Sequence, residues 1–236
     1  TSADKTYFLP PTLTNGNVHG IIVLNVYNER LLRLLAETQI PKVFLDTSSL
    51  VAPDELNGDL LLMESRTSVR RITSHLLEQG RTLPGFIGDI GYAQSNRERY
   101  EGFCQALTDA GKKVDSSLCL TTPLGIDTYR EEIDTFLSSL SRMPDAFVCA
   151  SDYVACILMQ LLEKRGLRVP EDVAVSGFDN NTEDLLAEHL TTVQVFNEEL
   201  GARLALQILY RIKYPNTPHE ITYLGTNVLY RDSTGD

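Results

Sequence analysis

The sequence lacks the residue patterns that mark catalysis, metal binding or membrane insertion. Its four cysteines form no CxxC pair, its four histidines lie in separate stretches, and no GxSxG, HExxH, GxxxxGKS/T or GxGxxG motif occurs. Without Cys/His ligand spacing, a zinc site is not expected. No apolar run approaches the ~18 residues of a membrane span. We therefore predict a protein that is not an enzyme, holds no metal or cofactor, and does not enter a membrane.

Basic residues are also scarce: 21 Lys and Arg stand against 32 Asp and Glu, giving a net charge of −11. Because affinity for nucleic acid comes mainly from cationic contacts to phosphates, we expect that this chain does not grip DNA by itself. The stretch from Ser65 to Arg71 holds only three arginines, which fit one solvated helix face. Cysteines among apolar neighbours favour reduced thiols in a cytoplasmic protein, and their even number leaves a disulfide open.

Short β-branched runs alternate with amphipathic stretches, which predicts an α/β fold with a doubly wound parallel sheet. At 236 residues and 42% apolar, the chain is long enough for two lobes, although the pattern alone also allows one large domain. The expected strands are Thr6–Leu9, Gly20–Leu24, Lys42–Leu45, Leu60–Met63, Gly85–Gly88, Ser117–Leu120, Ala146–Ala150, Val173–Ser176, Thr192–Gln194, Ile221–Leu224 and Asn227–Tyr230. The expected helices are Glu29–Thr38, Thr67–Gln79, Asn96–Ala110, Tyr129–Ser139, Tyr153–Lys164 and Asn197–Ile212, the last capped by Asn197.

The stretch LRVPEDVAVSGFDN, residues 167–180, is the most informative part of the chain. It predicts a turn and a short buried strand, Val173–Ser176, after which Asp179 and Asn180 emerge. In an open α/β sheet, ligands bind beyond the carboxyl ends of the strands. The carboxylate of Asp179 is therefore a candidate acceptor for ligand hydroxyl or ring N–H groups. The alternative is a carboxylate that caps the next turn through Asn180 and Asn181.

Together with that stretch, several blocks resemble, in order, the lactose- and galactose-repressor family of bacterial transcription regulators. The further blocks are Gly20-Ile-Ile-Val23, Ile40-Pro-Lys-Val-Phe-Leu-Asp46, His75–Gly80 with Gly85–Gly88, Ser95–Phe103, Pro144–Asp152, Leu190–Val193 and Leu229–Thr234. Each block is weak alone, but their order and spacing carry the assignment from about Gly20 to Thr234.

The resemblance implies two similar α/β lobes with an effector cleft between them. The amino-terminal lobe would comprise residues 1–63 and 194–222, and the carboxyl-terminal lobe residues 64–193 and 223–236. Family members act as homodimers whose effector moves a helix-turn-helix headpiece on operator DNA. Two departures are expected: no headpiece in this chain, and a first strand–helix step that is missing or shortened, since the first matching strand already arrives at Gly20.

Two candidate ligand contacts come from different parts of the matched blocks. Arg99 takes the position of the arginine three before the glycine of the family motif, where its guanidinium could hold hydroxyls or a carboxylate. Without the motif, a surface arginine that pairs with Glu98 or Glu101 would be the simpler interpretation. Asp46 ends an apolar strand and either reaches the ligand or acts as a turn residue that bonds Ser48.

The remaining candidates are less specific. Ser151 replaces an asparagine common in the family and would read a sugar hydroxyl, whereas Asp152 is the predicted N-cap of the following helix. Phe178 could stack on a sugar ring, although a core aromatic is the commoner outcome beside a strand. Tyr92 and Phe196 lie near the expected ends of elements that face the cleft.

The sequence thus predicts a cytoplasmic, homodimeric effector domain of a repressor that senses a small sugar-like metabolite. A nucleobase, a phosphorylated sugar or a partner protein stays open as the effector. The alternative from another class is a periplasmic sugar-binding protein of a transporter, which the RVPEDVAVSGFDN and RDST blocks disfavour. An α/β hydrolase would need a nucleophile or a catalytic pair that the sequence does not offer.

Overall fold

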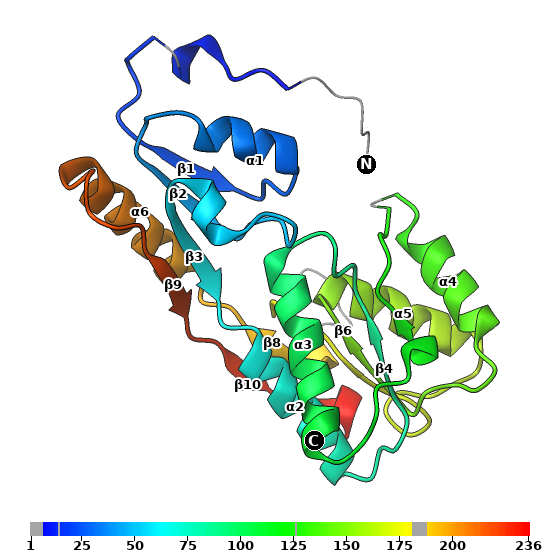
Figure 1. Cartoon of the computed structure of the whole chain (residues 1–236). Coiled ribbons are helices and arrows are strands. Elements are labelled where there is room, and N and C mark those ends of the chain that lie inside the picture. Colours follow the sequence, from blue (N-terminus) through cyan, green and yellow to red (C-terminus); the bar gives the residue numbers. More distant parts are fainter. Residues whose placement is uncertain (1–6, 14, 126, 181–187) are drawn as a thin grey trace. The chain divides into compact units, whose positions relative to one another are not determined.

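The computed structural model describes residues 7–13, 15–125, 127–180 and 188–236, and it divides into two compact units (Figure 1). Unit 1 comprises residues 1–64, 91–95 and 196–225, and unit 2 comprises residues 65–90, 96–195 and 226–236. Each unit is built on a four-stranded parallel sheet. The predicted α/β fold with two parallel sheets is confirmed.

In unit 1 the strand order is β1-β2-β3-β9. The strands are β1 (Ile21–Leu24), β2 (Lys42–Leu45), β3 (Asp59–Met63) and β9 (Ile221–Leu224), and the helices are α1 (Glu29–Ala36) and α6 (Asn197–Lys213). Leu32 and Leu35 of α1 join Phe44, Leu60 and Leu62 of the sheet in one apolar core. Helix α6 packs on β1 and β2, and Figure 1 shows it on the side of the sheet opposite α1.

In unit 2 the strand order is β5-β4-β6-β7, and a two-stranded antiparallel sheet pairs β8 with β10. The strands are β4 (Pro84–Ile87), β5 (Cys119–Leu120), β6 (Ala146–Cys149), β7 (Ala174–Ser176), β8 (Thr192–Gln194) and β10 (Asn227–Leu229). The helices are α2 (Arg66–Glu78), α3 (Gln94–Asp109, whose first two residues belong to unit 1), α4 (Tyr129–Ser139) and α5 (Asp152–Lys164). Buried residues of α4 and α5, such as Ile133 and Leu158, form a core with Phe147 and Val175.

Two sequence predictions about elements of unit 1 are wrong. Asn197 does not cap α6: the N-cap is Phe196, which makes no capping side-chain hydrogen bond, and Asn197 is the first helical residue. Of the predicted strand Thr6–Leu9, Thr6 lies outside the described residues and residues 7–9 are irregular, with Phe8 almost fully exposed.

Unit 1 also contains a short segment that the sequence does not mark. Residues 91–95 belong to it because the Gln94 amide donates to the Thr47 carbonyl at 2.8 Å and the Ser95 hydroxyl donates to Asp46 at 2.6 Å. The expected lobe boundaries, 63/64, 193/194 and 222/223, did not include this return of the chain, whose contacts are made at long sequence separation.

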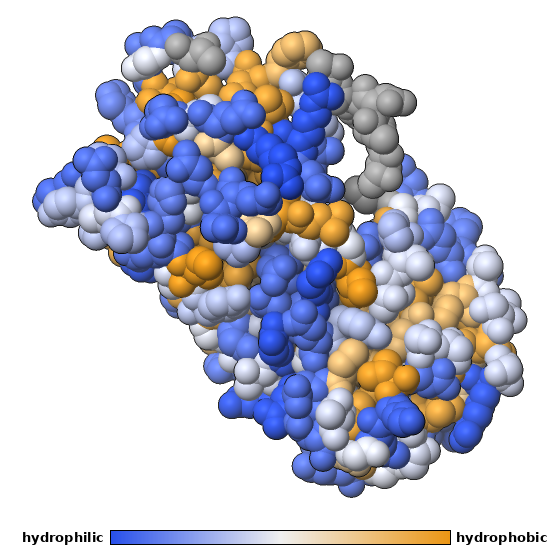
Figure 2. Space-filling model, in the orientation of Figure 1, coloured by the Kyte–Doolittle hydropathy of each residue, from blue (hydrophilic) through white to orange (hydrophobic). Residues whose placement is uncertain are grey.

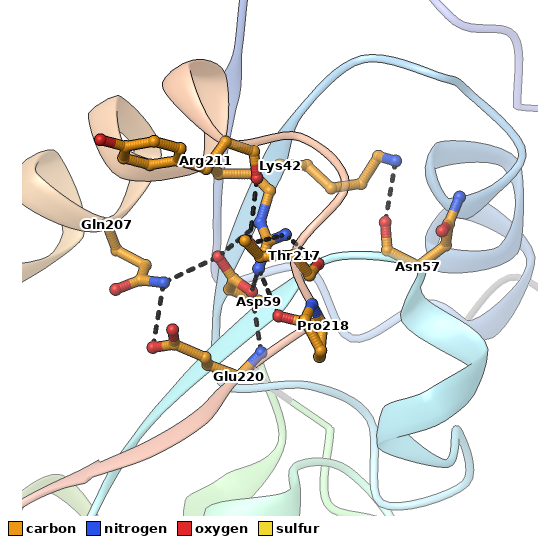
Figure 3. Close-up of polar contacts among 9 residues, drawn as sticks. Lys42, Asn57, Asp59, Gln207, Arg211, Thr217, Pro218 and Glu220 are labelled. Atoms are coloured by element: carbon orange, nitrogen blue, oxygen red, sulfur yellow. Dashed lines mark hydrogen bonds and ion pairs between the residues drawn. The ribbon is translucent and has the colours of Figure 1, made fainter.

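A buried ion pair fastens α6 to the sheet of unit 1 (Figure 3). The Arg211 guanidinium donates from Nε and Nη2 to the Asp59 carboxylate at 3.0 and 2.5 Å, and the two side chains are 2% and 0% exposed. Gln207 Nε2 and the Glu220 amide donate to the same carboxylate. Burial alone would raise the pKa of Asp59, but these hydrogen bonds, above all those from Arg211, hold it below its ordinary value. The pair therefore joins β3, α6 and the segment before β9.

Lys42 is a second buried cation in unit 1 (Figure 3). Its Nζ donates to the carbonyls of Thr38 and Asn57 at 2.9 and 3.1 Å. Burial lowers its pKa to about 8. Gly58 leaves room for the side chain, because a Cβ at this position would lie 2.5 Å from Lys42 Cγ.

Candidate functional site

The candidate site lies in unit 2, where the chain leaves the carboxyl end of β7. The backbone here is held from both sides: the Gly177 amide donates to the Thr191 carbonyl at 2.8 Å, and the Asp152 amide donates to the Phe178 carbonyl at 2.8 Å. Gly177 is required by close approach, since a Cβ would lie 2.2 Å from Asp152 Oδ1. These contacts place Asp179, two residues after Gly177, at a fixed point beyond the strand.

Arg99 of α3 meets this point from a position 80 residues earlier in the chain. Its guanidinium carbon lies 3.6 Å from the centre of the Phe178 ring, and Nη1 donates to the Ala150 carbonyl. Nη2 is 3.5 Å from Asp179 Oδ1, a weak ion pair. The side chain is buried, yet its Nε has no hydrogen-bond partner. A buried donor without an acceptor costs about 1–3 kcal/mol.

Asp179 has an unusual backbone conformation and a partly exposed side chain. Its φ is 109°, a region that residues with a side chain rarely adopt, and 44% of its side-chain surface is exposed. Strain of this kind costs about 1–3 kcal/mol and persists where the surroundings impose it. Burial of the carboxyl raises the pKa of Asp179, and the charge of Arg99 opposes that rise. The carboxylate is therefore partly exposed, partly desolvated by the surrounding protein, and close to a cation.

Phe178 and Ser151, which the sequence proposed as ligand contacts, have supporting positions in unit 2. Phe178 is fully buried, and its ring carries the Arg99 guanidinium. Ser151 is the N-cap of α5 and accepts a hydrogen bond from the Val154 amide at 3.3 Å. The predicted cap, Asp152, is instead the first helical residue, because its carboxylate accepts from the Thr192 hydroxyl at 2.6 Å.

Asp46 lies in unit 1 and is almost fully buried. Its carboxylate accepts hydrogen bonds from the Thr47 amide at 2.8 Å and from the Ser95 hydroxyl and amide at 2.6 and 3.3 Å. Ser48, the bonding partner that the sequence suggested, accepts instead from the Leu50 amide. The oxygens of Asp46 thus hold the segment 91–95 in place.

Two aromatic candidates also belong to unit 1. Tyr92 packs against Tyr27, with ring centres 4.3 Å apart. Phe196 stands at the N-terminus of α6 and is partly exposed. The alternative for Asp179, a carboxylate that caps the next turn through Asn180 and Asn181, involves Asn181, which lies outside the described residues.

Sequence reasoning missed two residues that support the site, Gln194 and Arg231. Asn180, next to Asp179, donates from Nδ2 to Gln194 Oε1 at 2.5 Å, and its Oδ1 accepts from Arg231 Nη2 at 2.8 Å. The available signal was the RDST block, whose arginine is Arg231. The pattern of this block alone does not show that Arg231 bonds Asn180, which lies 51 residues earlier in the chain.

Within the described residues, no group of three or more His, Cys, Asp or Glu side chains is placed to hold a metal ion. No helix in the same part of the chain is long and apolar enough to cross a membrane. The cysteines Cys104, Cys119, Cys149 and Cys156 are free thiols.

Comparison with known proteins adds three findings. A family profile described as a periplasmic binding protein-like domain matches residues 73–234. The transcriptional repressor PurR of Glaesserella parasuis serovar 5 (strain SH0165) is 27% identical over 206 residues, 86% of this chain and 59% of the repressor. The transcriptional regulator DegA of Bacillus subtilis (strain 168) is 31% identical over 170 residues, 71% of this chain and 48% of the regulator.

Among solved structures, the complex of the transcriptional regulator CelR with cellobiose is similar to this chain. It has a TM-score of 0.83 and 27% sequence identity, and the match covers 94% of this chain and 68% of that one. The chain spans about three fifths of the length of the PurR relative that it matches.

Proposed function

Because the chain belongs to the lactose- and galactose-repressor (LacI) family, whose effector-binding domain is periplasmic-binding-protein-like, we propose that it binds a small hydroxyl-rich metabolite. Its two units are the two lobes of that domain. In the whole protein, binding controls the DNA affinity of a helix-turn-helix headpiece, in the cytoplasm. The relatives named above are transcription regulators rather than enzymes, in line with the missing catalytic motifs.

The observation that carries this proposal is the pair of Arg99 and Asp179 beyond β7. A carboxylate accepts hydrogen bonds from hydroxyl groups, and a guanidinium donates to hydroxyl oxygens, so the pair can read two neighbouring groups of one ligand. A neutral sugar fits this pair better than a phosphorylated one, because Asp179 and the net charge of −11 would repel a phosphate. The cellobiose in the CelR complex supports the same ligand class.

A periplasmic sugar-binding protein remains the alternative from another class. Two relatives carry names of helix-turn-helix regulators, and the solved neighbour is a regulator, which favours the regulator. Sequencing the gene upstream of the Thr1 codon distinguishes the two: a helix-turn-helix supports the regulator, and a signal peptide contradicts it.

The proposed function is tested by a thermal-shift screen with cellobiose, glucose, galactose, ribose and adenine. A ligand at about 100 times its dissociation constant stabilises the native state by about 2.7 kcal/mol, which raises the melting temperature by about 5–10 °C. Asp179→Ala and Arg99→Ala are expected to abolish the shift. Glu131→Ala, an exposed acidic residue on α4, is the control and should keep it. A shift that survives both site substitutions would show that the site is elsewhere.

We further propose that the protein is a homodimer and that α6 forms part of the interface. The outer face of α6 repeats at spacings of three and four residues through Glu199, Ala202, Leu206, Leu209 and Lys213, all exposed. Leu206 and Leu209 are 60% and 62% exposed, which is unusual for a solvated face. This is the spacing by which helices pair along an apolar seam.

The charges on α6 favour an antiparallel pairing with a second copy. If two helices cross at Leu206, Glu199 near one end meets the partner's Lys213 near the other. On the face drawn in Figure 2, apolar surface interrupts the polar surface in several places, one of them where β9 runs in Figure 1. Ile221 and Tyr223 of β9 are about half exposed, so unit 1 offers apolar surface beyond α6.

Leu206→Glu is expected to convert the dimer to a monomer, because it places two like charges at the crossing point. Light scattering coupled to gel filtration measures the mass. Leu50→Glu, an exposed leucine of unit 1 outside α6, is the control and should stay dimeric. Lys213→Glu should weaken the dimer, and adding Glu199→Lys should restore it. A wild-type monomer at high micromolar concentration would contradict the proposal.

A further inference from the structure

Two consecutive residues with side chains, Asp179 and Asn180, have positive φ angles of 109° and 52°. Asparagine tolerates the left-handed region, but aspartate at 109° lies well outside its usual range. Strained backbone of this kind is stable only where neighbouring contacts impose it. Asp179 and its neighbour Asn180 must therefore be held by such contacts.

Asn180 is held at three points. Its Oδ1 accepts from Arg231 Nη2 at 2.8 Å, and its Nδ2 donates to Gln194 Oε1 at 2.5 Å. Its backbone amide donates to the Thr192 hydroxyl at 3.2 Å. The next residue back is fixed as well, since the Asp179 amide donates to the Val193 carbonyl at 3.1 Å.

The residues that hold Asn180 are themselves fixed to the backbone of the same region. Gln194 Nε2 donates to the Val195 carbonyl at 2.7 Å, and Arg231 Nη1 donates to the Leu190 carbonyl at 3.0 Å. Neither side chain is free to follow Asn180 if the turn relaxes.

The same contacts involve two of the segments that connect the units. The chain passes from unit 2 to unit 1 after Val195, directly beyond β8, and returns at Thr226, directly before β10. Gln194 is the last residue of β8, and Arg231 follows β10 by two residues. We call these two connecting segments the β8 and β10 crossovers. Because β8 pairs with β10, the residues that contact Asn180, next to Asp179, lie beside both crossovers.

We propose that Arg231, Asn180 and Gln194 are positioning residues that hold Asp179 in its ligand-reading geometry and make that geometry depend on the β8 and β10 crossovers. The inference rests on the proposed effector function of the Arg99–Asp179 pair. By reciprocity, a ligand that needs this geometry stabilises the paired crossovers by the same coupling free energy. None of the three residues has to touch the ligand, so none is a catalytic or reading group.

Asn180→Ala and Arg231→Ala test this inference with two readouts. The first is the titration of the Asp179 carboxyl followed by carbon-13 NMR without ligand. In the wild type, burial raises the pKa of Asp179 while Arg99 opposes the rise. In both variants we expect the pKa to move towards the ordinary value of about 3.9, because the released carboxyl turns to solvent.

The second readout is the affinity for cellobiose by calorimetry. Both variants should lose at least about tenfold, with melting temperatures close to the wild type, and Arg231→Lys should recover part of the loss. Arg165→Ala is the matched control: it removes an arginine of unit 2 that donates to the Leu161 and Asp134 carbonyls, and neither readout should change.

The outcomes separate this inference from the function on which it rests. Unchanged titration, or unchanged affinity in Asn180→Ala and Arg231→Ala when Asp179→Ala abolishes binding, overturns the positioning role and leaves the proposed function intact. Retained cellobiose binding in Asp179→Ala overturns the reading role of Asp179. If cellobiose does not bind the wild type, the titration decides the positioning role alone.

Discussion

Arg211→Met is expected to lower the free energy of unfolding by about 3–5 kcal/mol. The substitution leaves the Asp59 carboxylate fully buried without its cation, and an uncompensated buried charge carries a cost of this size. It also releases the carbonyls of Thr217 and Pro218, which accept from the same guanidinium. Urea unfolding followed by circular dichroism measures the change.

The double substitution Asp59→Leu with Arg211→Met is the control. Replacing both partners of a buried ion pair by apolar residues is often close to neutral, so it should recover much of the loss. Recovery will be incomplete, because Gln207 and the Glu220 amide lose their acceptor. If Arg211→Met costs less than about 1 kcal/mol, the ion pair does not fasten α6 to the sheet.

The Asp59 carboxylate also makes the free energy of unfolding depend on pH. The pKa of Asp59 is lowered in the native state, so its contribution is present above the unfolded value of about 3.9 and is lost as the pH falls through the lower folded value. This loss sets part of the acid sensitivity of the wild type.

Asp179→Gly is expected to raise the stability of the unliganded protein and to lower its affinity for the ligand. Glycine adopts φ of 109° without strain, so the unliganded protein should gain about 1 kcal/mol in free energy of unfolding. A hydrogen bond to a charged group contributes about 1.5–3 kcal/mol, so affinity for the sugar that gives a thermal shift should fall about 10- to 150-fold. Calorimetry and urea unfolding measure the two effects on the same sample.

Asp179→Asn provides the matched comparison, since it keeps a side chain of the same size but removes the charge. It should retain the backbone strain and lose part of the affinity. A variant Asp179→Gly that is less stable than the wild type would show that the carboxylate holds the fold, and that the strain does not serve ligand binding.

Local sequence was informative wherever a property depends on neighbouring residues. The alternation of β-branched and amphipathic stretches predicted most elements to within one or two residues, as for α4 at Tyr129–Ser139. The Val173–Ser176 run followed by Gly177 placed Asp179 beyond a strand end. The block containing Arg99 selected that arginine through the family pattern, although its helix alone favoured a surface residue.

The errors occur where one residue type has several local uses. Ser151 and Asp152 are both good N-caps, and the sequence favoured Asp152. Thr192, 40 residues away, decides the matter by binding the Asp152 carboxylate, which leaves the cap to Ser151. Likewise, Asp46 has Ser48 within reach in sequence, but it bonds Ser95.

The sequence by itself determined the α/β class, the order of the elements, the family and the residue that stands beyond β7, because these follow from periodicity and from short motifs. Only the tertiary structure decided which side chains meet: Arg99 with Asp179 over 80 residues, Asn180 with Arg231 over 51, and Arg211 with Asp59 over 152. The physical reason is that these pairs are created by chain crossings. Their free energy depends on the burial and geometry of both partners, and no local pattern records either one.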